Sequence, residues 1–116
     1  MGGDALVESK VKILKALADP TRLQILELLK NEERCVCELI PALGKAQSTT
    51  SKHLDVLYDA GILDRRVEGR RTIYRVKNPK VFEALRLVES MALEELARMA
   101  KALEAVKKPG EQAPSP

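Results

Sequence analysis

Residues 37–76 read CELIPALGKAQSTTSKHLDVLYDAGILDRRVEGRRTIYRV, and their pattern predicts two helices joined by a tight turn and followed by a β-hairpin. The first helix should run from about Cys37 to Leu43, because Gly44 suits the left-handed position that ends a helix. The second helix should cover residues 47–60. After Gly44, Lys45 and Ala46 make the tight turn between the two helices.

The second of these helices has an apolar and a polar face. Thr50, Leu54 and Leu57 recur at spacings of four and three residues, which predicts that they face a core. Short polar side chains and one lysine occupy the opposite face, and such groups can reach base edges or phosphates of DNA. A simpler interpretation of Ser48 and Thr49 is that they cap the helix. The candidate DNA-binding residues on this helix are Gln47, Ser48, Thr49, Ser51, Lys52 and His53.

Basic residues are concentrated in the predicted hairpin. Residues 65–80 contain seven Lys or Arg and one Glu, a net charge of +6, whereas the whole chain carries +3. This local charge indicates a polyanion-binding surface, although a solvated Arg-rich hairpin has the same composition. Arg70 and Arg71 lie near the turn, where a wing would meet the DNA backbone or minor groove. Of Arg65 and Arg66, strand alternation leaves one facing DNA, and Arg66 is the candidate.

A short helix, a turn, a recognition helix and a basic hairpin make a winged helix-turn-helix, whose second helix enters the major groove. Asp19 and Pro20 predict the N-cap and first position of a preceding helix that runs to about Lys30. Terminal helices are expected at residues 5–17 and 80–107, which gives a mainly α fold of order α-α-α-α-β-β-α. The expected core residues of the helix after Asp19 are Leu23, Ile25, Leu26 and Leu29.

The last predicted helix carries an apolar stripe along its whole length, about 40 Å at 1.5 Å per residue. One small domain cannot cover such a stripe, so we expect a homodimer formed through the terminal helices. A two-fold dimer matches a palindromic operator with half-sites about one DNA turn apart. The alternative is that this helix closes the core of a monomer. The stripe consists of Val81, Leu85, Val88, Ala92, Leu96, Met99, Leu103 and Val106.

Length and composition fit one soluble domain. We expect it at residues 1–108, with a DNA-binding core at 19–77 and a disordered tail at 109–116. The chain of 116 residues has 45% hydrophobic and 32% charged residues, and only three aromatic residues, which favours helices over strands. Neither a secretory signal nor an apolar run of about 20 residues is present, so we expect a cytoplasmic protein without a membrane partner.

Cys35 and Cys37 carry the most reactive side chains. Cysteines two residues apart are a poor disulfide framework, and a reducing cytoplasm should keep them as thiols. Cys37 should lie at a helix start, where free N–H groups and the nearby Arg34 lower a thiol pKa. Soft thiolates select thiophilic ions. Because residues i and i+2 do not face one another on a helix, holding one ion should shift this helix start and misplace the recognition helix.

Residues 17–76 resemble the ArsR/SmtB family of metal-responsive repressors, through the motifs LADPTR, CVCEL, SKHLDVL, AGIL and EGRRTIYRV. The resemblance implies a homodimeric winged-helix repressor, not an enzyme, that leaves its operator when a metal or metalloid binds. In this family CVC is the thiolate motif of arsenic, antimony, cadmium and lead sensors. The resemblance therefore implies that Cys35 and Cys37 bind As(III) or Sb(III) as inducer, with no permanent cofactor.

Two features depart from the family pattern. Arsenic sensors carry a third Cys where this chain has Ile40, and cadmium or lead sensors add one from an N-terminal arm, which residues 1–34 lack. One subunit therefore cannot supply three thiolates, and a small thiol, hydroxide or cysteine of a second subunit would complete the site. Residues 77–108 contain no His, which argues against the zinc site that other members carry on the last helix.

Other interpretations stay open at this point. Cys35 could be a small buried residue with only Cys37 accessible, or the site could have lost induction. The thiols could instead respond to oxidation or persulfide, or serve a cadmium or lead sensor. A nonspecific architectural DNA binder would lack the specific-to-nonspecific affinity ratio of roughly 10³ or more that a repressor shows. A thiol enzyme is disfavoured, because no thioredoxin-like alternation of strands and helices is present.

Overall fold

The structure is a computed structural model that describes residues 2–107. The chain divides into two compact units, residues 1–79 and 80–116. The last helix, from Lys80 on, forms the second unit, and Val81 is its buried residue among those described. The single domain expected over residues 1–108 stays a prediction. The expected tail at 109–116 lies outside the described residues. In chain order the elements are α1 (Gly2–Leu17), α2 (Pro20–Leu28), β1 (Arg34–Cys35), α3 (Val36–Leu43), α4 (Gln47–Asp59), β2 (Leu63–Glu68), β3 (Arg71–Val76) and α5 (Lys80–Val106).

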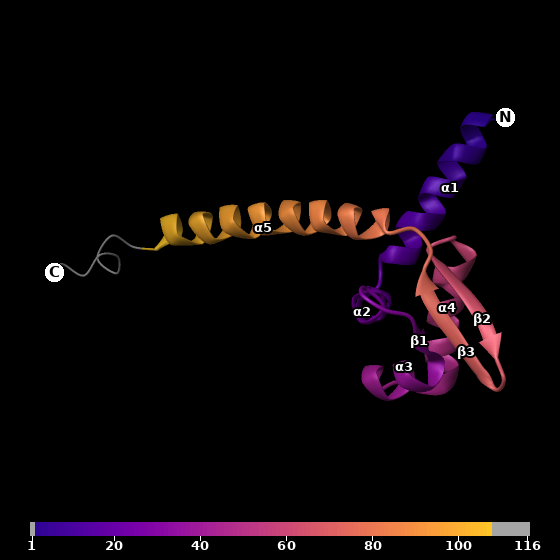
Figure 1. Cartoon of the computed structure of the whole chain (residues 1–116). Coiled ribbons are helices and arrows are strands. Elements are labelled where there is room, and N and C mark those ends of the chain that lie inside the picture. Colours follow the sequence, from indigo (N-terminus) through magenta and orange to yellow (C-terminus); the bar gives the residue numbers. More distant parts are fainter. Residues whose placement is uncertain (1, 108–116) are drawn as a thin grey trace. The chain divides into compact units, whose positions relative to one another are not determined.

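The first unit is a winged helix-turn-helix with a small apolar core. Helices α2, α3 and α4 contact one another, and the β2–β3 hairpin contacts α3 and α4 (Figure 1). The fully buried side chains come from all three helices and include Ile25, Leu26, Leu39, Leu54 and Leu57. The predicted fold class is therefore confirmed, with α3 and α4 as the helix pair and the hairpin as the wing.

Local sequence features account for where the helices begin and end. The Asp19 carboxylate accepts a hydrogen bond from the Arg22 backbone N–H at 3.0 Å, and Pro20 follows as the first helical residue, as predicted. Gly44 ends α3 with a φ of 67°. The expected burial of Leu23 is wrong, since this side chain is 41% exposed. Apolar spacing alone does not define which side of a short helix meets the core.

The sheet has three antiparallel strands in the order β1-β3-β2. The hairpin was predicted, and its turn contains Gly69 with a φ of +62°. Strand β1 was not predicted, because it has only two residues and its partner is distant in sequence. It pairs Arg34 with Tyr74 and Cys35 with Ile73. The residue before α3 is therefore hydrogen-bonded into the wing sheet.

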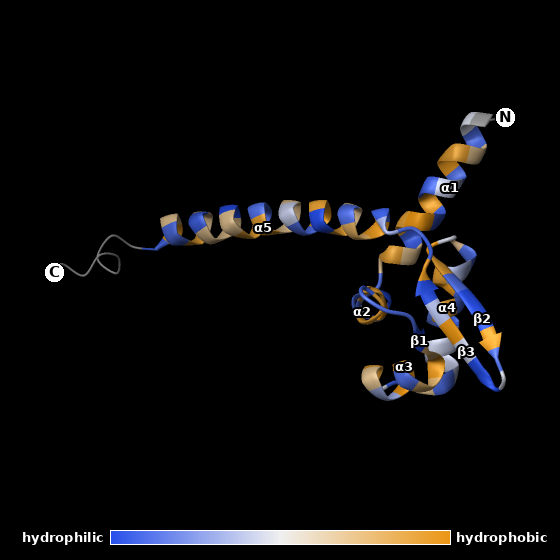
Figure 2. Cartoon of the chain, viewed as in Figure 1, coloured by the Kyte–Doolittle hydropathy of each residue, from blue (hydrophilic) through white to orange (hydrophobic). Residues whose placement is uncertain are grey.

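Both terminal helices carry apolar side chains that the described residues leave uncovered. Residues 3–15 of α1 are all exposed, and so are residues 86–106 of α5. Figure 2 shows hydrophobic and hydrophilic residues alternating along each of these helices. No helix among residues 2–107 is long and apolar enough to cross a membrane. The largest exposed apolar side chains are Leu6, Val7, Leu14, Leu87, Val88, Met91, Leu93, Leu96, Met99, Leu103 and Val106.

Candidate functional site

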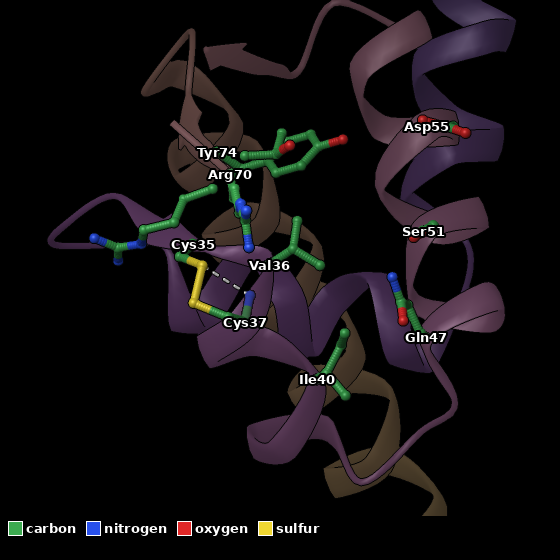
Figure 3. A pocket seen from close by; sticks show the side chains of 11 residues that line it. Cys35, Val36, Cys37, Ile40, Gln47, Ser51, Asp55, Arg70 and Tyr74 are labelled. Atoms are coloured by element: carbon green, nitrogen blue, oxygen red, sulfur yellow. Dashed lines mark hydrogen bonds between the residues drawn. A yellow bond between two sulfur atoms is a disulfide. The ribbon is translucent and has the colours of Figure 1, made fainter. Parts of the chain in front are cut away.

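Cys35 and Cys37 are joined by a disulfide bond, with their Cα atoms 5.1 Å apart (Figure 3). The sequence predicted two separate thiols, and the disulfide contradicts this. It also predicted Cys37 at a helix start, and Cys37 is indeed the second residue of α3. Cys35 is the N-cap of this helix, with an extended backbone at φ −72° and ψ 150°. This extended residue, followed by the first helical turn, brings both sulfurs to the same side of the chain. The two sulfurs therefore lie close enough to bond, and in this structure they are oxidised to a disulfide.

The two sulfurs have different surroundings. Cys35 is 2% exposed, whereas Cys37 is exposed to solvent. The Cys37 backbone N–H donates to Cys35 Sγ at 2.9 Å, and the Cys35 N–H donates to the Glu38 carboxylate at 2.9 Å. These two bonds form a capping box, in which Cys35 has the place usually taken by Ser or Thr. Negative charge on Cys35 Sγ would be stabilised by this N–H group and by the helix dipole.

Helix α4, the recognition helix predicted from the sequence, begins at Gln47 without a side-chain cap, because its N-cap residue is Ala46. The backbone N–H groups of its first turn therefore keep capacity for an anion. Ser48 and Thr49 do not cap the helix, contrary to the simpler interpretation of the sequence. The predicted core residue Thr50 is buried, and its hydroxyl donates to the Ala46 carbonyl at 2.9 Å. Of the predicted DNA-binding residues, Gln47, Ser48, Thr49 and Lys52 are exposed and Ser51 is half-buried.

His53 has protein partners on α2. The Arg22 Nη1 group donates to His53 Nδ1 at 3.0 Å, because a guanidinium has no acceptor atom. Arg22 also donates to the Lys15 and Ala16 carbonyls at 3.1 and 2.6 Å. The Asp19 carboxylate lies 3.8 Å from His53 Nδ1, and the Arg22 backbone N–H holds the pKa of Asp19 below its usual value. Sequence reasoning missed Arg22, whose partners lie on two other helices.

Three arginines within the wing strands, called here the base arginines to distinguish them from those at the turn, are held in ion pairs. They are Arg65, Arg66 and Arg75. Arg66 donates to Glu33 at 2.8 Å and to Glu68 at 2.6 Å. The Arg66 guanidinium lowers the pKa of Glu33, and the two carboxylates raise the pKa of Arg66. Arg65 lies 3.8 Å above the Tyr58 ring and donates to Asp55 at 3.2 Å.

The arginines at the wing tip have weaker attachments. Arg70 has no hydrogen bond or ion pair among the described residues, and Arg71 reaches the Glu38 carboxylate only at 3.8 Å. Both side chains are exposed. The wing tip therefore offers two positive charges to an external anion.

Comparisons with known proteins agree with this geometry. The model of the arsR family of bacterial regulatory proteins matches residues 19–65. An HTH-type transcriptional regulator of Methanocaldococcus jannaschii, itself uncharacterized, is 44% identical over 72% of this chain and 96% of its own. A putative arsenical resistance operon repressor of Halobacterium salinarum is 42% identical over 64% of this chain and 58% of its own.

A solved structure is also similar. It is the homodimeric winged helix-turn-helix DNA-binding domain of a possible ArsR-family transcriptional regulator from Mycobacterium bovis. The two are 36% identical, the match covers 83% of this chain and 89% of the other, and the TM-score is 0.73. The matched proteins are DNA-binding regulators and not enzymes.

Proposed function

Because the chain belongs to the arsR family of bacterial regulatory proteins, we propose that it is a repressor released from its operator by chemistry at Cys35 and Cys37. One observation carries the proposal. Cys35 is at once the N-cap of α3 and the strand partner of Ile73 in the wing. A change at its sulfur therefore acts on the first helix of the DNA-binding pair and on the wing together.

The DNA-contacting surface in this proposal is the start of α4 together with the wing tip. Gln47, Ser48, Thr49 and Lys52 would meet base edges and phosphates in the major groove, with Ser51 at the edge of this face. Arg70 and Arg71 would meet the backbone or the minor groove. His53 and Arg66, also candidates from sequence, would position these surfaces through Arg22 and Glu33 rather than touch DNA.

The operator in this proposal is palindromic and is bound by a homodimer. The exposed apolar faces of α1 and α5 support dimerisation, because they are large for a monomer surface. The M. bovis neighbour is homodimeric and supports the same assembly. A two-fold dimer would present its two recognition helices to half-sites about one DNA turn apart.

The inducer in this proposal is As(III) or Sb(III), bound by the reduced pair. Two adjacent thiolates suit a thiophilic ion, and exposed Cys37 gives it access. Residues 2–107 contain no cluster of three or more His, Cys, Asp or Glu that could hold a metal. The third ligand would therefore come from a small thiol, hydroxide or a second subunit. The similarity to the Halobacterium arsenical repressor supports this choice of ion.

A second candidate signal is thiol oxidation, and the disulfide favours it. In the oxidised form neither sulfur is a thiolate, so the pair cannot bind a metal ion. Oxidation and metal capture would then be competing events at one site. The two candidates differ in what releases the protein from DNA. If oxidation is the signal, the reduced protein binds the operator without any ion, and the oxidised protein does not bind it.

Fluorescence anisotropy with the DNA upstream of the gene tests both candidates. The reduced protein, kept anaerobic, is titrated with arsenite, antimonite, cadmium and zinc in turn, and the oxidised protein is measured without ions. We expect release by arsenite or antimonite. Release by cadmium alone would assign a cadmium- or lead-type sensor, and release by oxidation alone would assign the redox signal.

Cys37→Ser is the matched variant for this experiment. It removes the exposed sulfur and leaves the N-cap at Cys35 in place. The variant should bind the operator as the wild type does and should not respond to ions or oxidants. A Cys37→Ser protein that still releases normally would refute control by the cysteine pair.

A further inference from the structure

A pocket of about 430 Å³ lies beside the disulfide, within the winged-helix unit. Its volume is in the range of roughly 300–1,000 Å³ that is typical of small-molecule sites. Figure 3 shows the two cysteines on one side and Gln47, Ser51 and Asp55 in a row along α4 on the other. The wing supplies the remaining polar lining, namely Arg70, Arg71, Thr72 and Tyr74.

We propose that this pocket binds a low-molecular-weight thiol carrying carboxylate groups, which exchanges with the Cys35–Cys37 disulfide to form a mixed disulfide on Cys37. The proposal rests on the proposed thiol control of this protein and names the second reactant. It concerns a binding site and a covalent step, so it can be measured without DNA.

The two sulfurs define the direction of the exchange. Cys37 is exposed and Cys35 is buried, so an incoming thiolate reaches Cys37 Sγ. A bond forms between the incoming sulfur and Cys37 Sγ, the Cys35–Cys37 bond breaks, and its electron pair leaves on Cys35 Sγ. The incoming thiol has already given its proton to solvent. The incoming sulfur is oxidised and Cys35 Sγ is reduced, so the disulfide itself serves as the oxidant and no other is needed. The Cys37 N–H at 2.9 Å and the start of α3 stabilise the Cys35 thiolate, and a more stable thiolate leaves faster.

The positive charges around the pocket favour an incoming thiol that carries carboxylate groups. Arg70 has no ion-pair partner among residues 2–107, and the Glu38 contact of Arg71 is long, at 3.8 Å. The lining carboxylate, Asp55, is already paired with Arg65 at 3.2 Å. Two guanidinium groups are thus available, and arginine binds carboxylates through paired hydrogen bonds. A neutral thiol would react with the same sulfur without this attraction.

The experiment compares two thiols on the oxidised, full-length protein. Mercaptosuccinate carries two carboxylates and 2-mercaptoethanol carries none. Samples are quenched with acid, the mixed disulfide is measured by intact mass, and its position is mapped by peptide mass. Rates are corrected for the thiolate fraction and basicity of each thiol. We expect mercaptosuccinate to react about tenfold faster than 2-mercaptoethanol, because one charge-assisted hydrogen bond is worth about this factor. The adduct should form on Cys37.

Two variants with the same loss of charge separate the pocket from the general field of the wing. Arg70→Gln/Arg71→Gln should reduce the mercaptosuccinate rate to that of 2-mercaptoethanol. Arg75→Gln/Lys77→Gln removes two hairpin charges that do not line the pocket and should keep the preference. Equal corrected rates in the wild type, an adduct on Cys35, or equal effects of the two double variants would overturn the proposal.

Operator binding is then measured on the purified adduct, as a separate result. A selective adduct on Cys37 that still binds DNA normally would uphold the pocket and count against control of DNA by the cysteines. A repressor that is released by oxidation or arsenite but shows no thiol preference would uphold the proposed function and count against the pocket.

Discussion

The base and the tip of the β2–β3 hairpin are both rich in arginine, but their arginines have different partners. At the base, Arg66 is held by Glu33 and Glu68, and Arg75 by Asp64 at 2.9 Å. At the tip, Arg70 has no ion pair among residues 2–107, and the contact of Arg71 with the Glu38 carboxylate is long, at 3.8 Å. The same residue type therefore anchors the wing at one end and offers free charge at the other.

This difference explains why the net charge of a sequence segment overestimates the charge that is available to DNA. The segment 65–80 carries +6, but ion pairs within the protein neutralise part of that charge before any ligand arrives. Exposed ion pairs add little to stability one by one, although a network that joins a loop to a strand fixes its position. The comparison predicts that substitutions at the tip change DNA binding and those at the base change folding.

Removing both tip arginines should have the largest effect. Arg70→Ala/Arg71→Ala should weaken operator binding roughly a hundredfold, since each charged hydrogen bond is worth about 1.5 kcal/mol. The slope of log K for operator binding against the logarithm of the salt concentration should become shallower by about 2, because two phosphate contacts are lost. Anisotropy titrations at several salt concentrations measure both quantities. Unchanged affinity would mean that the tip does not meet DNA.

Gly69→Ala tests the turn at the wing tip. Gly69 has a φ of +62°, and a Cβ there would meet no atom within 4 Å, so the cost is backbone strain alone. We expect a loss of about 1 kcal/mol in the free energy of unfolding. Urea denaturation followed by circular dichroism measures it. A neutral result would show that the turn relaxes to another conformation.

Arg66→Ala should have a smaller effect on DNA and a visible effect on folding. The loss of contacts to Glu33 and Glu68 should lower the unfolding temperature, while operator affinity should fall by less than about tenfold. Calorimetry and anisotropy on the same preparation provide the two readings. A fall in affinity as large as that of the tip variant, with unchanged unfolding temperature, would make Arg66 a DNA contact instead.

The smallest expected effect is on acid stability. Arg66 lowers the pKa of Glu33 in the folded protein, whereas the unfolded value is close to 4.5. A lowered folded pKa contributes stability above the unfolded value, and that contribution is lost as pH falls through the folded pKa. Glu33→Gln should therefore be less stable than the wild type at neutral pH, and the difference should shrink below about pH 4.5. Thermal unfolding at several pH values measures it.

Local sequence features predicted much of the first unit. The Asp19-Pro20 start of α2, the Gly44 end of α3 and the buried positions Thr50, Leu54 and Leu57 depend on residues within one or two turns of helix. The turn around Gly69 depends on the conformation that one glycine allows. Such features are visible in sequence because their causes lie close together along the chain.

Features that depend on distant partners were not predicted. Cys35 is a strand residue because it pairs with Ile73 in β3. A strand of two residues is too short to show a periodic pattern in the sequence. The ion pair of Arg66 with Glu33 joins residues far apart in sequence, and so does the contact of Arg22 with His53. The disulfide needed the backbone at Cys35 to be extended, which follows from the same β1–β3 pairing.

Arg22 has a consequence for how such proteins can be recombined. Its side chain binds the end of α1 through two carbonyls and the recognition helix through His53. A chimera that exchanges the N-terminal helix while keeping the DNA-reading half would cut through this contact. Grafts should therefore carry residues 15–22 as one block together with His53, so that a new N-terminal helix inherits the orientation of the old one.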